Sequence, residues 1–388
     1  MSPPPVRSWA SGSSTAVELL VRLALVVFVG EIARDVFTND VSTYFFRAQD
    51  VGWHHLPYKD FLWEYPPLAS LPLALIPLLG RSNAAFHVAF VLGTVAMEYG
   101  SLCLLRRALV DAAERARLTR FWNAAVLPLA AIAWFRLDFA PMLCATLAVL
   151  AMTAGRRWVA PTVLGFAVKL WPIVFVVPMV LRRRYRDAGL AVAASAAVVA
   201  GWWAFSPTGF GQFLDFRAGS GFQVESLPGA ITMLFSDREV EYRFGAMVVG
   251  DQGVHWVQAI MGVVLVGAPA LCSLVAWRRR SRGLAVDDVA LMGAFVGTAL
   301  VCQRLLSPQF LVWLAPFLAL RLARRERIAA AFVVSSWITA AVIQWYWQFL
   351  SRTTVLVGAV VVRDLLLVGI TVALYVAALR PAPEDVNP

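Results

Sequence analysis

The stretch WVAPTVLGFAVKLWPIVFVVPMVL, residues 158–181, decides the architecture because arginines flank it on both sides. Arg156–Arg157 precede it and Arg182–Arg184 follow it, and clustered arginines mark loops on the cytoplasmic side of a membrane. A helix needs about 20 apolar residues to cross a bilayer, so this stretch is too short to cross twice. It therefore predicts a re-entrant pair of half-length helices. Proline disfavours helix at the preceding residue, which puts the turn at Val168–Pro172 and Lys169 at its tip.

The whole chain repeats this apolar character. Its 388 residues are 60% hydrophobic and 15% charged, and the mean hydropathy is +0.69. Soluble domains carry about 25% charged residues, so this composition excludes a large soluble enzyme and a disordered chain. Long apolar runs recur from Ala16 to Leu379. They predict an all-α polytopic membrane protein with about 10–12 transmembrane segments, the half-length pair included.

The basic residues show how the chain is oriented. The formal net charge is +10, and most arginines lie in five runs between apolar segments, at residues 106–120, 156–157, 182–186, 278–282 and 321–327. By the positive-inside rule these runs are cytoplasmic loops. We therefore attribute the charge to topology and to contact with anionic lipids. Membrane lipids are expected partners, and nucleic acid is not.

These charges divide the chain into one membrane domain with a tail at each end. Residues 1–15, rich in Pro and Ser, are expected to be a flexible cytoplasmic tail, and residues 380–388 a second one. Residues 16–379 form a single transmembrane domain. Its two longest connections, residues 38–83 and 206–253, carry more acidic than basic side chains and are expected to be extracytoplasmic loops. This predicts a multi-pass protein of the plasma membrane with its polar loops outside.

The remaining apolar runs predict the individual spans. They are Ala16–Phe37, Ala84–Leu105, Phe121–Phe135, Phe139–Thr153, Gly189–Phe205, Val254–Trp277, Val286–Cys302, Phe310–Leu320, Ile328–Trp345 and Val355–Leu379. Leu68–Leu79 is too short to span and is expected to lie at the outer interface. Arg363 and Asp364 are adjacent in the last span and are expected to pair inside the bundle.

The first outer loop contains the side chains that sugars need. Asp40 and Tyr44 are followed by the segment PYKDFLWEYPP, residues 57–67. Carboxylates accept hydrogen bonds from hydroxyl groups, and aromatic faces pack on the apolar face of a pyranose. Asp40, just after the first span, is the candidate general base for an acceptor hydroxyl. The alternative is an ordinary interfacial carboxylate that caps a helix.

Three cations are candidates for holding a phosphate near the outer surface. Arg136 lies between two short spans, Arg304 lies just before Ser307, and Lys169 is at the tip of the predicted hairpin. Arg gives planar bidentate contacts to phosphate, whereas Lys acts as a point charge. For each Arg the alternative is snorkelling to the lipid headgroups. A lone ammonium at the depth of Lys169 is costly unless it meets water or an anion, which favours phosphate binding there.

The second outer loop and the missing motifs narrow the chemistry. Gln223, Glu225 and Ser226 form a polar set before Pro228 that either lines a sugar site or is a surface turn. The sequence contains no P-loop, no nucleophile elbow and no His/Cys spacing typical of metal sites. It also lacks the Asp-x-Asp pattern that holds a metal and a nucleotide diphosphate, which disfavours a nucleotide-sugar donor. A phosphate-bearing lipid donor fits; no cofactor is expected, and a divalent metal stays open.

Six segments together match the pattern of a known family. They are Asp40 with Tyr44, Pro57–Leu68, Arg136–Asp138, Lys169–Pro172, Phe222–Ser226 and Ser307–Gln309. In this combination the sequence resembles the GT-C fold glycosyltransferases of family 87, the actinobacterial polyprenyl-phosphate-mannose-dependent α-mannosyltransferases. The resemblance extends over residues 16–379. The organisation is similar to that of the mycobacterial enzymes that extend phosphatidylinositol mannosides.

The resemblance implies an inverting transfer in a single GT-C-like domain. Mannose would pass from polyprenyl phosphate mannose to a hydroxyl of a lipid-linked or cell-envelope glycan and form an α-mannoside. Asp40 would be the base, and Lys169, Arg136 and Arg304 would hold the phosphate of the leaving group. Sugar and acceptor contacts would come from Tyr44, Tyr58, Asp60, Glu64, Tyr65, Asp138, Gln223, Glu225, Ser226 and Gln309.

Two alternatives remain at this stage. A polyprenyl-phosphate pentose such as arabinose would use the same phosphate contacts. A polytopic lipid or sugar transporter also contains buried cations, but transporters are commonly built from internal repeats, and this sequence shows none. The gathering of polar residues in two outer loops favours an enzyme.

Overall fold

The structure, a computed structural model, describes most of the chain. The described residues are 12–32, 39–52, 54–218, 221–243, 245–250, 255–320, 322 and 326–380. Most of the expected first tail and all but Arg380 of the second therefore lie outside the described residues, and so does the end of the first expected span.

The first part of the chain consists of helices and short 3-10 segments. Their bounds are α1 Gly12–Ile32, α3 Asn39–Ala48, η1 Pro67–Ala74, α4 Leu75–Leu78, α5 Asn83–Ala108, α6 Ala112–Ala133, α7 Phe139–Thr153, α8 Val159–Val168, η2 Trp171–Phe175, α9 Val176–Leu181, α10 Tyr185–Phe205 and α11 Pro207–Ala218.

The second part adds three short strands to the helices. Its elements are β1 Phe222–Gln223, α12 Leu227–Phe235, β2 Val240–Arg243, β3 Ala246–Val249, α13 His255–Ser281, α14 Asp288–Val301, η3 Pro308–Leu314, α15 Ala315–Ala319, α16 Glu326–Gln344, α17 Tyr346–Leu350 and α18 Thr354–Leu379.

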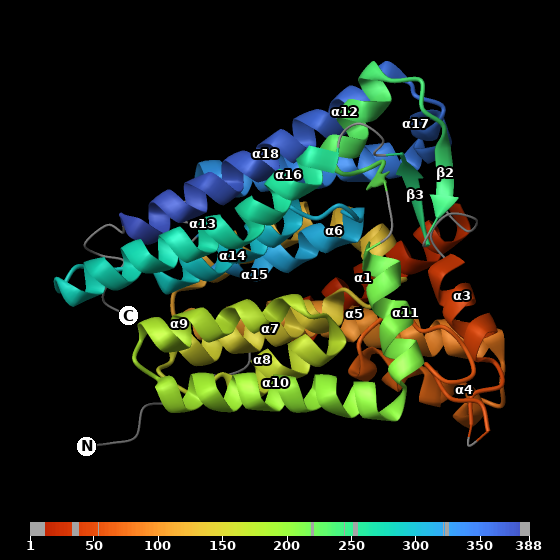
Figure 1. Cartoon of the computed structure of the whole chain (residues 1–388), viewed down its shortest axis with the longest axis horizontal. Helices are drawn as coiled ribbons and strands as arrows, with labels where there is room; N and C mark the ends of the chain where they lie inside the picture. The colour runs from red at the N-terminus through yellow and green to blue at the C-terminus, as the bar shows by residue number, and fades with distance from the viewer. Residues whose placement is uncertain are drawn as a thin grey trace.

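The long helices lie lengthwise in the molecule, and the strands gather at one end of it (Figure 1). Among the described residues, α5, α10, α16, α18 and residues 256–281 of α13 are long and apolar enough to cross a membrane, and six shorter apolar helices accompany them. This confirms the predicted all-α polytopic class. The number of about 10–12 spans stays a prediction.

Arginines from several turns meet at the opposite end from the strands. Arg182 and Arg280 both pair with Asp288, at 2.5 and 2.6 Å, and Arg184 donates to the backbone oxygen of Arg156 at 2.8 Å. We call this the arginine-rich end. Three of the five predicted cytoplasmic loops therefore meet at one end of the bundle.

The hairpin predicted between the arginine runs is present. α8 ends at Val168, Lys169 is its C-cap, and η2 and α9 return the chain. The two legs are tied together by Trp158, whose indole Nε1 donates to the backbone oxygen of Phe175 at 3.2 Å. A Cβ at Gly165 would lie 2.9 Å from Cγ of Pro172 and 3.0 Å from Cβ of Cys144. Gly165 therefore permits the close packing that closes the hairpin.

Replacing Gly165 tests this packing. Gly165→Ala is expected to lower the free energy of unfolding by about 1–3 kcal/mol because the added methyl overpacks a full site. Thermal unfolding of the purified protein measures the effect. Gly189→Ala on α10 is the matched control, since a Cβ there meets nothing within 4 Å. Equal melting temperatures for the two variants would contradict the proposed role of Gly165.

Buried ion pairs hold the bundle together from inside. The Arg22 guanidinium on α1 pairs with Glu98 on α5 at 2.6 Å, and both side chains are almost fully buried. Trp122 on α6 also donates to Glu98, at 2.6 Å, so three helices share one carboxylate. Arg363 and Asp364 pair at 2.7 Å inside α18, as predicted.

The outer connections contain more structure than the sequence analysis predicted. The first includes α3 in addition to η1 and α4, which coincide with the expected short helix at Leu68–Leu79. The second includes α11, α12 and an antiparallel three-stranded sheet of order β1-β3-β2. These additions lie at the end opposite the arginine-rich end (Figure 1), where the predicted site residues are also found.

Candidate active site

Asp40 and Arg136 form an ion pair between two elements far apart in the sequence. Asp40 is in the first turn of α3, and Arg136 is in the connection between α6 and α7. The guanidinium lies 3.1 Å from each carboxylate oxygen of Asp40, through Nε to Oδ2 and through Nη2 to Oδ1. Thr94 fixes this connection by donating to the backbone oxygen of Trp134 at 2.6 Å. The Asp40 and Arg136 side chains are 30% and 19% exposed, so a ligand can reach the pair.

Asp138 and Lys169 form a second ion pair two residues along the same connection. The Lys169 Nζ donates to Asp138 Oδ1 at 2.6 Å, and both side chains are buried. Trp313 of η3 donates to the same oxygen from its indole nitrogen at 3.0 Å. The hairpin tip is therefore joined to the α6–α7 connection, and the buried ammonium meets an anion, as its depth requires.

Aromatic rings surround the Lys169 ammonium. Its Nζ lies 4.0 Å from the ring centre of Phe310, 5.0 Å from that of Trp313 and 5.7 Å from that of Tyr65. The negative faces of aromatic rings stabilise such a cation. Phe310 and Trp313 were not among the predicted site residues. Their three-residue spacing after Pro308 was the signal that could have found them, because it puts both rings on one face of a helical turn.

The tyrosines of the first loop hold that loop in shape. The hydroxyls of Tyr44 and Tyr65 are 3.0 Å apart, and Tyr58 donates to the backbone oxygen of Tyr65 at 2.7 Å. Trp63 packs edge-on against Tyr44, with 5.4 Å between ring centres. Burial raises the pKa of all three tyrosines well above the usual value. They therefore stay protonated and act as hydrogen-bond donors at neutral pH.

Two carboxylates of the first loop, Glu64 and Asp60, have different kinds of partner. Glu64 accepts from Arg47 of α3 at 2.6 Å and remains beside Tyr65. Asp60 instead accepts from the backbone nitrogen of Leu56 at 2.7 Å in an exposed turn. The structure thus brings Glu64 to the Asp40 neighbourhood through α3, whereas Asp60 is used as a turn cap.

The second loop joins the site through Gln223 of β1. The backbone nitrogen of Gln223 donates to the backbone oxygen of Arg304 at 3.0 Å, and its side-chain nitrogen donates to the hydroxyl of Ser307 at 3.1 Å. Gln309 follows in η3 and is buried, with Oε1 unpartnered among the described residues. Predicted residues from two separate segments, around Gln223 and around Arg304, therefore lie in one neighbourhood.

Glu225 is buried beside α17 and α18. Its Oε1 accepts from the Tyr346 hydroxyl at 2.8 Å, and its backbone oxygen accepts from Arg363. Burial raises the pKa of the Glu225 carboxyl, and the Tyr346 hydrogen bond partly opposes that rise. Burial also raises the pKa of Tyr346 most, followed by Glu225, while the Arg136 cation lowers it. The charge of Arg136 thus reaches Tyr346 of α17, the hydrogen-bond partner of Glu225.

Ser226 shapes the start of α12. Its hydroxyl donates to the backbone oxygen of Gln223 at 2.7 Å and accepts from the backbone nitrogen of Gly229 at 3.3 Å, the pattern of an N-cap. A Cβ at Gly229 would lie 2.1 Å from the Gln223 oxygen. Backbone atoms cannot move away from such a contact without opening the turn.

Gly229→Ala is therefore expected to displace the turn that carries Gln223 and Ser226. We expect a loss of about 2 kcal/mol or more in the free energy of unfolding and a matching loss of glycosyl transfer. Thermal unfolding and activity are measured on the same preparation. Gly211→Ala on α11 is the control, because a Cβ there meets nothing within 4 Å. A Gly229 variant with the melting temperature of the control would show that the turn tolerates the methyl.

The described residues offer little that would hold a metal. Among them, no group of three or more His, Cys, Asp or Glu side chains is arranged as a metal site.

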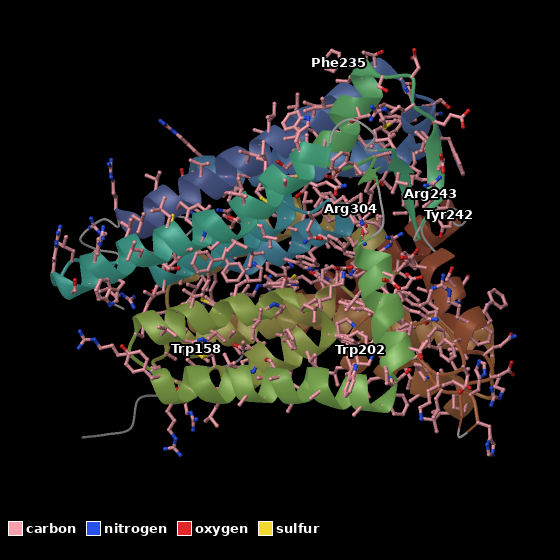
Figure 2. The ribbon with its side chains drawn as sticks, in the orientation of Figure 1. Trp158, Trp202, Phe235, Tyr242, Arg243 and Arg304 are labelled. Carbon is pink, nitrogen blue, oxygen red and sulfur yellow. The ribbon has the colours of Figure 1, made fainter. Side chains whose placement is uncertain are left out.

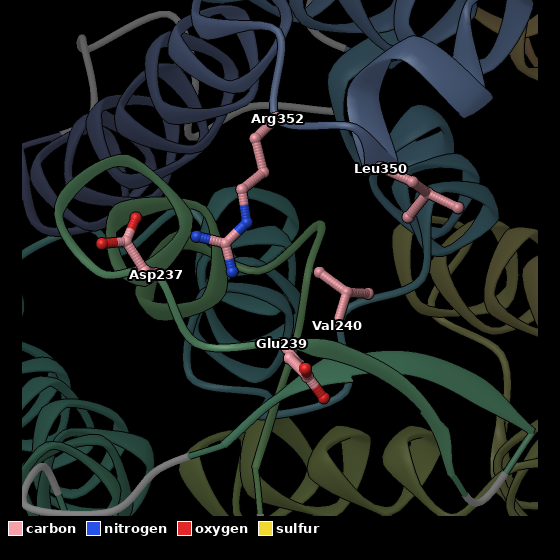
Figure 3. Close-up of a pocket in the computed structure, with 5 residues that line it drawn as sticks. All are labelled: Asp237, Glu239, Val240, Leu350 and Arg352. Atoms are coloured by element: carbon pink, nitrogen blue, oxygen red, sulfur yellow. The ribbon is translucent and has the colours of Figure 1, made fainter.

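An open pocket of about 410 Å³ lies between the α12–β2 connection and the turn before α18 (Figure 3). It is lined by Asp237, Glu239, Val240, Leu350 and Arg352. Arg352 donates to the backbone oxygen of Ser236 there. This pocket is lined by none of the predicted site residues.

A comparison with protein families identifies the chain. The model of glycosyltransferase family 87 matches residues 63–308. The chain belongs to glycosyltransferase family 87. This confirms the family that the six segments indicated, and with it a membrane-embedded glycosyltransferase. The match includes the three cations Arg136, Lys169 and Arg304, the carboxylate Asp138 and the polar turn at 223–226. Asp40, Tyr44, Tyr58, Asp60 and Gln309 lie outside it.

Solved structures similar to this family 87 chain include two of ArnT from Cupriavidus metallidurans. The apo structure is 16% identical with a TM-score of 0.47, and the structure bound to undecaprenyl phosphate is 15% identical with a TM-score of 0.49. Each comparison covers 95% of this chain and 78% of the ArnT chain. A search of curated proteins gave no match.

Proposed function

We propose that this family 87 enzyme moves mannose from polyprenyl phosphate mannose to a hydroxyl of a lipid-linked or cell-envelope glycan, with inversion to an α-mannoside. The observation that carries the proposal is the pair of ion pairs on one short connection. Arg136 lies 3.1 Å from Asp40, and Asp138 lies 2.6 Å from Lys169. A base and two phosphate-binding cations gathered around one short connection are what a single displacement at a glycosyl phosphate needs.

In the proposed reaction Asp40 takes the proton from the acceptor hydroxyl. The acceptor oxygen forms a bond to the anomeric carbon while the bond from that carbon to the phosphate oxygen breaks. The electron pair leaves with the polyprenyl phosphate, whose added negative charge is stabilised by Arg136 and Lys169. Arg304, joined to Gln223 through its backbone oxygen, is proposed as a third cation for the phosphate.

The ion pair of Arg136 suggests how donor binding prepares the base. A phosphate competes with Asp40 for the guanidinium, since both present paired oxygens to it. When Arg136 turns to the phosphate, Asp40 loses the cation that holds its lone pairs. The carboxylate is then free to accept a proton. Donor binding would therefore precede proton transfer.

An apolar groove near the hairpin supports a lipid donor. It has a volume of about 520 Å³ and is lined by residues of α8, η2, α10 and α11. Phe166 and Ile173, two of these residues, flank Lys169 in the sequence at a distance of three and four positions. A polyprenyl chain in this groove would carry its phosphate toward the hairpin tip.

The orientation of the protein in the membrane supports an extracytoplasmic active site. The arginine-rich end is cytoplasmic by the positive-inside rule, and α3 with the strands gathers at the opposite end (Figure 1). Polyprenyl-linked sugars supplied in the outer leaflet would meet Asp40 there. We therefore propose that the enzyme acts at the outer surface of the plasma membrane.

The deciding experiment supplies purified enzyme in lipid nanodiscs with radiolabelled polyprenyl phosphate mannose and a panel of lipid and glycan acceptors. Polyprenyl phosphate arabinose is the competing donor. We expect transfer from the mannose donor only, and an α-linked product by NMR. A β-linked product, transfer only from arabinose, or no transfer with any acceptor would refute the proposal.

A further inference from the structure

An exposed tyrosine on strand β2 lies at the edge of the small sheet. Tyr242 is 70% exposed and pairs across the sheet with Met247 of β3. β2 is an edge strand, and its last three residues are all exposed. The aromatic ring of Tyr242 therefore lies outside the core and is accessible to a ligand.

Four charged residues of the candidate site act on this tyrosine. The end of β2 that carries Tyr242 and Arg243 lies beside α3 (Figure 2). Partial desolvation of the phenol raises the pKa of Tyr242 most, Asp40 and Glu64 raise it further, and Arg47 and Arg136 lower it. Interactions between solvent-exposed charges are largely screened beyond about 10 Å. The tip of the second loop therefore lies close to the base and to its ion-pair partner.

Solvent exposure falls stepwise from Tyr242 through Asp40 and Arg136 to Lys169. Tyr242 is 70% exposed, Asp40 30%, Arg136 19% and Lys169 9%. Asp40 is thus intermediate between an exposed ring and a buried cation. A transfer between two substrates needs its base between them, with the acceptor on the open side and the donor phosphate on the closed side.

We infer that Tyr242 belongs to the acceptor site and carries a pyranose ring of the acceptor on its aromatic face, next to Asp40. This rests on the proposed function, because it identifies the surface that holds the second substrate. The ring offers an apolar face to the C–H groups of a sugar. The Arg47–Glu64 ion pair, at 2.6 Å, supplies donors and acceptors for the sugar hydroxyls at the same place.

Binding is tested first, without turnover. Methyl α-D-mannopyranoside is used as the probe with the full-length enzyme in nanodiscs, and saturation-transfer NMR reports contact of its ring protons with the protein. We expect signals with the wild type and with Tyr242→Phe, and their loss with Tyr242→Ala. Absent signals with the wild type, or undiminished signals with Tyr242→Ala, would overturn the inference.

Kinetics then separate acceptor binding from donor binding. Tyr242→Ala is expected to raise the acceptor KM about tenfold, with the donor KM within about twofold of the wild type. Tyr242→Phe keeps the ring and is expected to restore the acceptor KM. An equal rise of both KM values, or a Phe variant as impaired as the Ala variant, would reject stacking on the ring.

A matched surface aromatic controls for loss of apolar surface. Phe235 ends α12 in the same loop and is 83% exposed, and Phe235→Ala is expected to bind and turn over like the wild type. The failure of the proposed function is distinguishable. Probe binding that depends on Tyr242 without mannosyl transfer would refute the transfer alone, whereas transfer independent of Tyr242 would refute the inference alone.

Discussion

Asp40→Asn is expected to lower the rate of mannosyl transfer by about 10²–10⁴-fold while the protein remains folded. The amide has nearly the shape of the carboxylate and still accepts a hydrogen bond from Arg136, but it does not take up a proton. The side chains of the pair are only 30% and 19% exposed, so replacing the anion is expected to lower the free energy of unfolding by about 1–3 kcal/mol.

The donor KM distinguishes a base from a binding residue. In Asp40→Asn the Arg136 guanidinium no longer faces an anion, so we expect the donor KM to be unchanged or lower. Single-turnover measurement of label transfer gives the rate of the chemical step. Asp50→Asn is the control. Asp50 is an exposed carboxylate of the same loop, and its ion pair with Arg81 is long, at 3.9 Å. Normal transfer by Asp40→Asn would remove Asp40 as the base.

Removal of Lys169 is expected to impair donor use rather than acceptor use. The ammonium is one of two cations proposed for the leaving phosphate, so the donor KM should rise at least about tenfold, the effect of about 1.4 kcal/mol of lost binding. The substitution has a second effect, because it leaves Asp138 buried and unpaired. Breaking such a pair costs about 3–5 kcal/mol of stability. With Lys169→Ala alone, a rise in the donor KM therefore cannot be separated from a loss of folded protein.

A double variant separates these effects. Lys169→Met with Asp138→Asn removes both charges, and the Asn oxygen still accepts from the Trp313 indole. Its melting temperature should recover relative to Lys169→Ala, whereas its donor KM should stay high. Asp138→Asn alone keeps Lys169 and is the reference for the double variant. If the double variant and Asp138→Asn have the same donor KM, Lys169 does not bind the phosphate.

The membrane fold was predictable from the sequence because its signals are local. Apolar length and arginine clusters depend only on neighbouring residues, and α7 agrees with its predicted span, Phe139–Thr153, at both ends. The hairpin was predictable for the same reason, from a length limit and one proline. The sheet was not, since its strands have two to four residues and pair only after the second loop has folded back on itself.

The site was predictable as a set of residue types but not as an arrangement. The sequence indicated Asp40, Arg136 and Lys169 as separate base and phosphate ligands. The structure pairs each of these cations with a carboxylate instead. Asp60 and Glu64 are both carboxylates of the same aromatic-rich loop, yet Asp60 caps a turn. The hydrogen bonds within a loop depend on the path of its backbone, which residue types alone do not reveal.

The sequence by itself thus determined the membrane class, the arginine-rich side, the re-entrant hairpin and the family. These follow from hydropathy, charge and short motifs, which operate over one helix length or less. Only the tertiary structure decided that residues from α3, the α6–α7 connection, the hairpin and η3 share one neighbourhood. Such contacts join residues 31 to 175 positions apart, and their geometry is set by how the helices pack.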